Sequence, residues 1–562
     1  MGDGMTQTLT NPLLEDPQLL TDLERIWQDG QAQVDELERA RLEPPFVRLW
    51  DGDWQLRTRI AGEISAHFQW KLNDTGVGTV VLPFDHHVVE WVIGWRMRKR
   101  NVHITCDKDG ARWGGRLNRL VVTRTDSGDR EIRLEFLHDY EELKHILVWS
   151  NPVLPAIVQF PRAFTLAGPA IWSLKTALFL NLMRNQNSLF TLPDDPLDFS
   201  QWTGNLNMAN WPIAMRGGSF LADSSPHTIV SSRFKTFHDL AAPILADAQL
   251  MVTCQRWLEG DPEPWPGYTP RNGQLIVDIV DKSGWFGATG TGGNILQGIL
   301  RTVMQLGDDL VDSDRSVVPD PNVVPVRGDW LGTAPSNPWI VLRDGDVTGI
   351  ESSEFTWQPA TDVQIVVGGH SMPGVNEIIS SAIQVAGDLA STTWIGPNVN
   401  LGQVADTLLA PLYTDTLMAW MAVKSFARAT DAGWSHYFER LPSGADRAYT
   451  LSSLMALRRG FWETRERIGH KLKVRDGAPY LIGENGRGHY FLGDRIASTI
   501  PGLPRGELVV DQVSVLDLAW DRPTPPGWDV TIGDLHATES GLDQIVRQVA
   551  GAVEAAKTLG VL

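Results

Sequence analysis

At 562 residues, with 42% hydrophobic and 21% charged side chains, the chain is too long for one ordinary core and predicts a globular protein of roughly three or four domains. Its 68 acids and 49 bases give a net charge of −19, which argues against a nucleic-acid groove as the main surface. Its two cysteines, Cys106 and Cys254, exclude a disulfide framework and cannot complete a tetrahedral zinc site alone.

The opening residues are acidic and lack the basic and apolar segments of a signal peptide, and no apolar run reaches the roughly 18 to 20 residues that cross a bilayer. Neither secretion by a signal peptide nor membrane anchoring is therefore expected. The composition is unusual in its tryptophan content, with 23 tryptophans against 7 tyrosines. Large rings are enriched in cores and at protein interfaces, so this content indicates extensive packing or assembly.

Residues 1–43 are expected to form an N-terminal helical segment, which Pro44 and Pro45 end. Apolar residues recur in it at helical spacing and make a narrow stripe among acids and arginines. This stripe requires a surface to cover, on the same subunit or on a neighbour. Its members are Leu19, Leu20, Leu23, Ile26, Trp27, Val34, Leu37 and Leu42.

Residues 44–150 are predicted to be the first β-barrel-like domain. Short alternating segments are separated by Asp-Gly, Asn-Asp-Thr-Gly and Ser-Gly-Asp turns, a pattern typical of hairpins in a small barrel or sandwich. The apolar segment between Asp85 and Arg98 is expected to be a helix that plugs one end.

The stretch from Arg130 to Leu180 is predicted to be a hinge between this β domain and helical material. A strand should end near Leu137, a short amphipathic helix should follow from His138, and a second helix should run from Ile171 to Met183. The passage from Trp149 to Leu180 is expected to leave the barrel and to pack against an adjacent domain or subunit. The histidines and acids of the hinge are interpreted as ordinary surface.

Five further units complete the expected multidomain α+β architecture. Residues 151–233 form a helical and loop connector, and residues 234–338 form an α/β domain in which a helix precedes a strand hairpin. Its Gly-rich apolar part, 286–312, resembles a mobile flap, with a partly ordered surface loop as the alternative. Residues 339–400 and 470–535 form a second β-barrel-like domain, interrupted by a helical insertion at 401–469 and followed by a C-terminal helix at 536–562.

A faint internal similarity supports two related barrels. The segment GRLNRLVVTRTDSGDREIRLEF and the segment GELVVDQVSVLDLAWDRPTPPGWDVTIGD each have a Gly-x-Leu start, an alternating strand, a turn and a second strand.

No motif predicts chemistry. The sequence GHSMPG at Gly369 to Gly374 has Pro373 where a nucleophile elbow needs glycine, and the run Gly287 to Gly293 lacks the Gly-Lys-Ser/Thr ending of a phosphate loop. No carboxylate pair stands out from the acidic background, which leaves glycosidase chemistry unsupported. The histidines are interpreted as structural or surface groups because the spacing in each pair, His86 with His87, His103 with Cys106 and His138 with His145, does not suit a shared metal. We therefore predict no catalytic, metal-binding or cofactor-binding residues.

The order of these segments resembles minor tail proteins of actinobacterial, mycobacteriophage-type siphophages, and in particular the tail-tip or baseplate hub proteins of long non-contractile tails. The resemblance covers about residues 45 to 535 and is strongest over Phe136 to Pro155 and over Gly368 to Glu377.

The resemblance implies a hub-like homotrimer in the virion tail tip, assembled in the host cytoplasm. It would close the tail tube below the distal tail protein ring, connect to the tape-measure protein and to other minor tail proteins or a central fibre, and open for DNA delivery. Contact with the host cell envelope is a further expected interaction, whereas sequence-specific nucleic-acid binding and cofactors are not expected. The alternatives are a tail-associated cell-wall-degrading enzyme and a peripheral receptor-binding tail protein.

Overall fold

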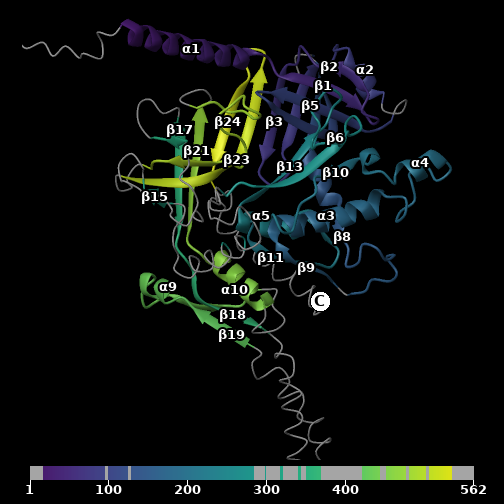
Figure 1. The fold of residues 1–562 in the computed structure, drawn as a ribbon. Helices are drawn as coiled ribbons and strands as arrows, with labels where there is room; N and C mark the ends of the chain where they lie inside the picture. Colours follow the sequence, from purple (N-terminus) through teal and green to yellow (C-terminus); the bar gives the residue numbers. More distant parts are fainter. Residues whose placement is uncertain are drawn as a thin grey trace, which may run out of the picture.

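The structure, a computed structural model, is a mixed α+β protein organised around one large sheet (Figure 1). It describes residues 17–94, 99–124, 128, 130–161, 163–283, 298, 301, 317–319, 340–343, 350–368, 420–442, 451–475, 480–500 and 506–533. Most of the predicted flap at 286–312, the GHSMPG sequence at 369–374 and the predicted C-terminal helix at 536–562 lie outside these residues.

The large sheet has 14 strands, and all of its pairings are antiparallel except one between two short strands, β16 and β22. The main path runs in the order β17 (Ile350–Gln358), β21 (Arg467–Arg475), β24 (Gly527–Ile532), β23 (Glu507–Asp521), β3 (Ser65–Lys71), β4 (Val77–Pro83), β7 (Arg130–His138), β6 (Ala111–Arg124), β5 (Val102–Lys108), β1 (Phe46–Asp51) and β2 (Leu56–Arg59). The strands off this path are β15 (Val317–Pro319), β16 (Val341–Leu342) and β22 (Arg495–Ser498).

Strands from the two predicted barrels join in this single sheet. β3 pairs with β23 in antiparallel register, from Lys71 opposite Val515 to Ser65 opposite Asp521. Each strand thereby satisfies backbone N–H and C=O groups that would otherwise form an open sheet edge. In the described residues the outer strands β2 and β17 each pair with one neighbour only, so the expectation of two separate barrels is corrected to one shared sheet.

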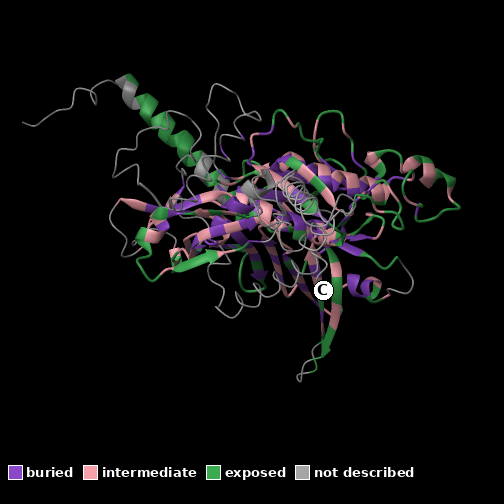
Figure 2. Ribbon diagram, turned by 90° about the horizontal axis from the view of Figure 1, so that it is seen from below, coloured by how far each residue is buried: buried purple, intermediate pink, exposed green. Residues whose placement is uncertain are grey.

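One hydrophobic core lies under this shared sheet, and residues from both halves fill it. Phe68 of β3 contacts Trp113 of β6 and Trp520 of β23, with ring centroids 5.1 and 5.7 Å apart. Trp70 packs similarly against Trp528, at 5.1 Å. The burial of β3 alternates strictly, which confirms the period-2 pattern of its sequence. Buried residues accordingly gather inside the sheet in Figure 2.

The predicted helix between Asp85 and Arg98 is present as α2 (Val88–Ile93), which inserts three valines into this core: Val88, Val89 and Val92.

A second core forms beside the sheet, from the segments that follow β7. It contains the 3₁₀ helix η3 (Asp139–His145), α3 (Ala170–Gln186), α5 (Phe237–Ala248) and a sheet in the order β10 (Ile213–Met215), β14 (Leu275–Asp281) and β13 (Leu250–Arg256). The predicted helix at 171–183 and the predicted helix before a hairpin are therefore confirmed. The expected amphipathic helix after His138 is a 3₁₀ helix instead.

Short elements surround this second core. Two small sheets pair β9 (Phe164–Pro169) with β11 (His227–Ser232) and β8 (Leu147–Val148) with β12 (Lys235–Thr236). The connector also contains α4 (Phe199–Gly204) and the 3₁₀ helix η4 (Met208–Asn210).

A third, smaller core lies between a three-stranded sheet and a helix. The central strand β18 (Asp362–Gly368) pairs with β19 (Trp420–Lys424) and with β20 (Tyr437–Arg440), and α9 (Phe426–Asp431) and α10 (Leu451–Glu463) complete the unit. The expectation that 401–469 is a helical insertion is thus wrong for Trp420–Lys424 and Tyr437–Arg440. Both segments are strands because they satisfy the two edges of β18, a partner distant in sequence.

The helix α1 (Pro17–Leu42) confirms the predicted N-terminal helix and extends away from the sheets (Figure 1). Its described side chains are exposed, and they include three large apolar ones: Leu23, Ile26 and Trp27. Within the residues described, no helix has both the length and the apolar character needed to span a membrane.

The shared core makes a stability prediction. Replacing Phe68, which is 0% exposed, with alanine should lower the free energy of unfolding by about 3–5 kcal/mol, because it removes ring contacts to both halves of the sheet. Denaturant unfolding followed by tryptophan fluorescence measures this. Val122→Ala on the exposed face of β6 is the control, with an expected change below about 0.5 kcal/mol. Equal effects of the two substitutions would contradict a shared core at Phe68.

Candidate functional site

A buried ion pair connects the large sheet to the second core. Asp139 follows the end of β7 and opens η3, whereas Arg256 is the last residue of β13. Arg256 Nη2 donates to Asp139 Oδ1 at 2.7 Å, and the two side chains are 4% and 1% exposed. A pair this buried is costly to desolvate, but loss of one partner would leave an uncompensated charge inside the protein. The pair therefore fixes the geometry of the hinge.

A second arginine supports the same junction from the sheet. Arg112 of β6 forms ion pairs with Asp107 and Asp261, and its Nη1 donates to the carbonyl oxygen of Arg256 at 3.0 Å. One guanidinium group thus holds the sheet, the end of β13 and the loop after β13. Planar guanidinium groups suit this task because they present several donors in a fixed arrangement.

An aromatic pair covers Arg256. The Trp54 ring stacks on His103 with centroids 4.5 Å apart, and the Arg256 guanidinium lies 4.7 Å from the Trp54 ring centroid. Gly273 is required below this ring, because its φ is +79° and a Cβ atom there would lie 2.0 Å from Trp54 Cγ. Burial, followed by the positive charge of Arg256, lowers the pKa of His103 to about 3. His103 therefore stays neutral at physiological pH.

Close packing extends to the backbone of β6. A Cβ atom on Gly114 would lie 2.2 Å from Asp139 Oδ2, so the carboxylate occupies the space that a side chain would need. The junction consequently depends on glycine at this position of the strand.

The elements of the predicted hinge are present, but the interpretation as ordinary surface is wrong for Asp139, and His138 is half-buried. Asp139 is 2% exposed, and the ring of His138 lies 5.4 Å from Trp113, where its Nδ1 accepts a hydrogen bond from the Tyr140 backbone N–H. Burial lowers the pKa of His138 to about 4. His145 does lie at the surface, near Glu141.

The remaining residues singled out from the sequence are not brought together into a reactive group. His86 Nε2 lies 3.1 Å from the Ala61 carbonyl oxygen, and His87 Nε2 lies 2.9 Å from Thr58 Oγ1. Cys106 is buried in the sheet core, where burial raises the pKa of its thiol well above the usual value. Among the described residues, no three His, Cys, Asp or Glu side chains are grouped to hold a metal.

Sequence reasoning missed Arg256 as a junction residue, although the pattern of β13 contained a signal. Leu250, Val252, Cys254 and Arg256 alternate along one strand and therefore point to one face. Because the first three of these residues are apolar and share that face, the alternation predicts that Arg256 is buried as well. Its partner, 117 residues away in sequence, could not be identified from the strand itself.

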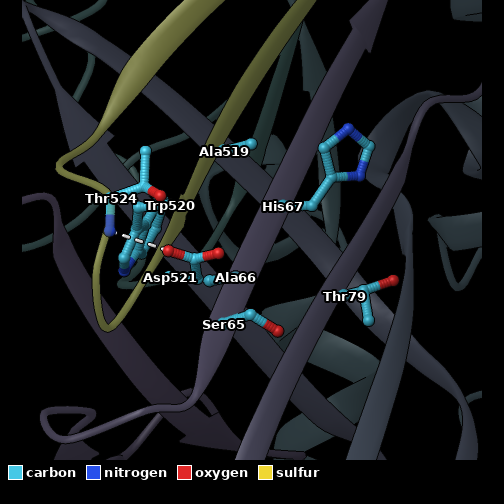
Figure 3. Close-up of a pocket in the computed structure, with 8 residues that line it drawn as sticks. All are labelled: Ser65, Ala66, His67, Thr79, Ala519, Trp520, Asp521 and Thr524. Carbon is cyan, nitrogen blue, oxygen red and sulfur yellow. Dashed lines mark hydrogen bonds between the residues drawn. The ribbon is translucent and has the colours of Figure 1, made fainter.

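A shallow hollow of about 310 Å³ lies where the two halves of the sheet meet (Figure 3). Ser65, His67 and Thr79 line it from β3 and β4, and Trp520, Asp521 and Thr524 line it from β23 and the turn that follows. The Asp521 carboxylate accepts a hydrogen bond from the Thr524 backbone N–H at 2.8 Å, while the His67 ring points away from it. His67 pairs instead with Asp517, whose Oδ1 lies 2.8 Å from His67 Nε2.

Among the described residues, large apolar side chains are exposed in the connector and in the unit of β18 to β20. The connector surface is the set in the loop before β9, in the loops on either side of α4 and in α4 itself: Val153, Ile157, Val158, Phe160, Leu189, Leu192, Leu197, Phe199 and Leu206. The aromatic surface is the set on the unit of β18 to β20: Trp420, Phe426, Trp434, Tyr437, Phe438 and Leu441. Tyr437 and Phe438 are neighbours in β20 and therefore point to opposite faces of the strand. Large exposed apolar side chains are candidates for burial in contacts with other molecules.

The ion pair predicts non-additive effects of substitution. Asp139→Asn should lower the free energy of unfolding by about 3–5 kcal/mol, because Arg256 keeps its charge in a buried site. Asp139→Asn combined with Arg256→Met should cost less than the sum of the single changes, as a double-mutant cycle in denaturant can measure. Glu135→Gln, which breaks an exposed pair with Arg119, is the control and should leave the unfolding midpoint nearly unchanged. Strict additivity would contradict a coupled pair.

His103 predicts a loss of stability in acid. The unfolded chain takes up a proton at His103 near pH 6.5, whereas the folded chain does so only near pH 3, so the unfolded state is favoured as pH falls between these values. His103→Phe keeps a ring on Trp54 and removes the titrating group, so its unfolding midpoint should fall less than that of the wild type between pH 7.5 and pH 4.5. Parallel pH profiles for the two proteins would argue against this role of His103.

Comparison with known proteins agrees with the resemblance found in the sequence. A family model described as Siphovirus ReqiPepy6 Gp37-like protein matches residues 46–534. Minor tail protein Gp28 of Mycobacterium phage L5 is 37% identical in an alignment that covers 96% of this chain and 98% of that protein. Minor tail protein Gp28 of Mycobacterium phage D29 is 36% identical, with coverages of 91% and 94%.

Among solved structures, prophage tail protein gp18 from Listeria monocytogenes EGD-e covers 91% of this chain and 99% of its own, with 10% identity and a TM-score of 0.39, a likeness too weak to carry an argument. The family is assigned from the two sequence relatives, because they align with this chain along nearly their whole lengths. The chain therefore belongs to the Siphovirus ReqiPepy6 Gp37-like family and is a phage minor tail protein, a component of the virion tail.

Proposed function

We propose that this minor tail protein forms the trimeric hub of the tail tip. In this role three copies close the tail tube below the distal tail protein ring, contact the tape-measure protein and the central fibre or other minor tail proteins, and open for DNA delivery. The protein acts through its interfaces and has no active site. The single observation that carries the proposal is the large amount of apolar surface left exposed on one chain of this tail-protein family.

Several large apolar side chains are almost fully exposed on the single chain. Ile157, Leu197 and Phe199 on the connector surface are 90%, 88% and 83% exposed, and Trp434 on the aromatic surface is 93% exposed. The residues of the three cores are buried, and none of these exposed groups belongs to them. Contact with neighbouring subunits or with other tail proteins would remove them from water.

The strand order supports a role beneath a sixfold ring. Two hairpins, β23–β24 and β6–β7, lie on either side of the β3–β4 hairpin in the large sheet. They are the segments whose sequences share a Gly-x-Leu start and two strands. We propose that these related halves, which correspond to the predicted domains at 44–150 and at 339–400 with 470–535, let three subunits offer six similar surfaces.

The junction supports a rigid link between the sheet and the second core. Opening for DNA delivery requires parts of a hub to move, and a buried ion pair with covering rings resists bending at its own position. We propose that movement takes place outside the Asp139 and Arg256 junction. The net charge of −19 suits a conduit for DNA, since acidic walls would not retain a polyanion.

Imaging of the tail tip tests the hub proposal. Electron cryomicroscopy of the virion is expected to show three copies on the tail axis below the tube. Copies at the periphery of the tail would overturn the hub role and favour a receptor-binding tail protein. Zymography of the purified chain on a mycobacterial cell-wall preparation is expected to show no clearing, and clearing would favour the cell-wall-degrading alternative.

A further inference from the structure

We infer that α1 associates with copies of itself into a parallel helical bundle, and that this bundle helps to hold the subunits together. The inference deepens the proposed function and rests on it for the number of copies, three. The partner that covers the apolar face of α1 is thus α1 of another copy of this chain, and not a groove on a different protein.

The spacing of the apolar residues in α1 is that of a coiled coil. Alternate steps of three and four residues connect Leu20, Leu23, Trp27, Gly30, Val34 and Leu37. These are heptad positions a and d; Gly30 lacks an apolar side chain, and the pattern ends before the next position a, which is Arg41. An a and d stripe with apolar residues beside it at position g is typical of helices that pack together in a bundle.

Three large apolar side chains on or beside this stripe are exposed among the described side chains of α1. Leu23, Ile26 and Trp27 are 49%, 63% and 65% exposed, and the helix extends away from the sheets in Figure 1. A helix of 26 residues is about 39 Å long, and in water most of the stability of such a helix must come from packing of its apolar face. A partner helix with the same spacing supplies that packing.

The flanking positions suit a parallel bundle of more than two helices. Position g is occupied by Leu19, Ile26, Gln33 and Ala40, so the seam widens from a and d towards a face suited to a bundle. In parallel helices position g of one copy faces the next position e of another, which gives the pairs Leu19 with Glu24, Ile26 with Gln31 and Gln33 with Glu38. None of these pairs opposes two like charges.

The proposed symmetry requires the parallel direction. Subunits around a three-fold axis are related by rotation about that axis, so their α1 helices all run the same way along it. An antiparallel pair would need a two-fold axis, and in it Trp27 would face Gly30 of the other copy. The two arrangements therefore place different residues in contact.

Sedimentation of the full-length protein tests the association. The wild type is expected to be a trimer, and Trp27→Glu should raise its dissociation constant by about thirtyfold or more, because a buried tryptophan anchor is lost to a charge. Gln28→Glu adds the same charge at position b, away from the seam, and should assemble as the wild type does. A monomeric wild type, or equal assembly of the two variants, would overturn the inference. An unchanged denaturant midpoint for the sheet core shows that both variants are folded.

Cysteine crosslinking tests the direction. Leu23→Cys alone should form disulfide-linked pairs on mild oxidation, as parallel copies place position 23 opposite itself, while Gln28→Cys and the wild type should not. Crosslinking only between Leu23→Cys and Val34→Cys chains would show antiparallel helices and overturn the inference. If the crosslinks are parallel but the protein lies off the tail axis, the hub proposal is wrong and the α1 inference stands. If the protein is a trimer on the tail axis and Trp27→Glu leaves that trimer intact, the α1 inference is wrong and the hub proposal stands.

Discussion

The pairing of β3 with β23 is the constraint on which the rest of the structure depends. It joins two parts of the chain so distant that the His67 and Asp517 side chains, 2.8 Å apart, are separated by 450 residues in sequence. Without it, each half would expose a sheet edge and half of an aromatic core. With it, Phe68 and Trp70 become shared contacts between the halves, and everything between these strands is held as an insertion with fixed ends.

Buried polar contacts join the insertion to the sheet at the junction after β7. The Asp139 and Arg256 pair, Arg112 and the Trp54 and His103 stack lie where the sheet meets the second core, and each belongs to a different segment. Buried charges of this kind add little net stability, but they tolerate few alternative arrangements, because every group must keep its partner.

The apolar side chains of the described residues fall into a buried set and an exposed set. Those with strand or helix periodicity in the three cores are buried, whereas the connector surface, the aromatic surface and the described side chains of α1 are exposed. Tryptophan belongs to both sets: Trp113 and Trp70 are buried in the sheet core, while Trp27 and Trp434 are exposed to water on the single chain.

Local patterns in the sequence determined the elements. Period-2 alternation predicted the strands of the sheet, and helical spacing predicted α1, α3 and α5, because burial on one face leaves a periodic trace in the chain. The same alternation identifies the face of β13 on which Arg256 lies. The family resemblance likewise followed from ordered segments that can be recognised in sequence.

Only the tertiary structure decided how these elements combine. The two expected barrels became one sheet, β19 and β20 became strands beside β18, and Asp139 became a buried ion-pair partner instead of a surface acid. Each of these outcomes depends on a partner tens to hundreds of residues away. Periodicity records which face of an element is buried, but it does not record what covers that face.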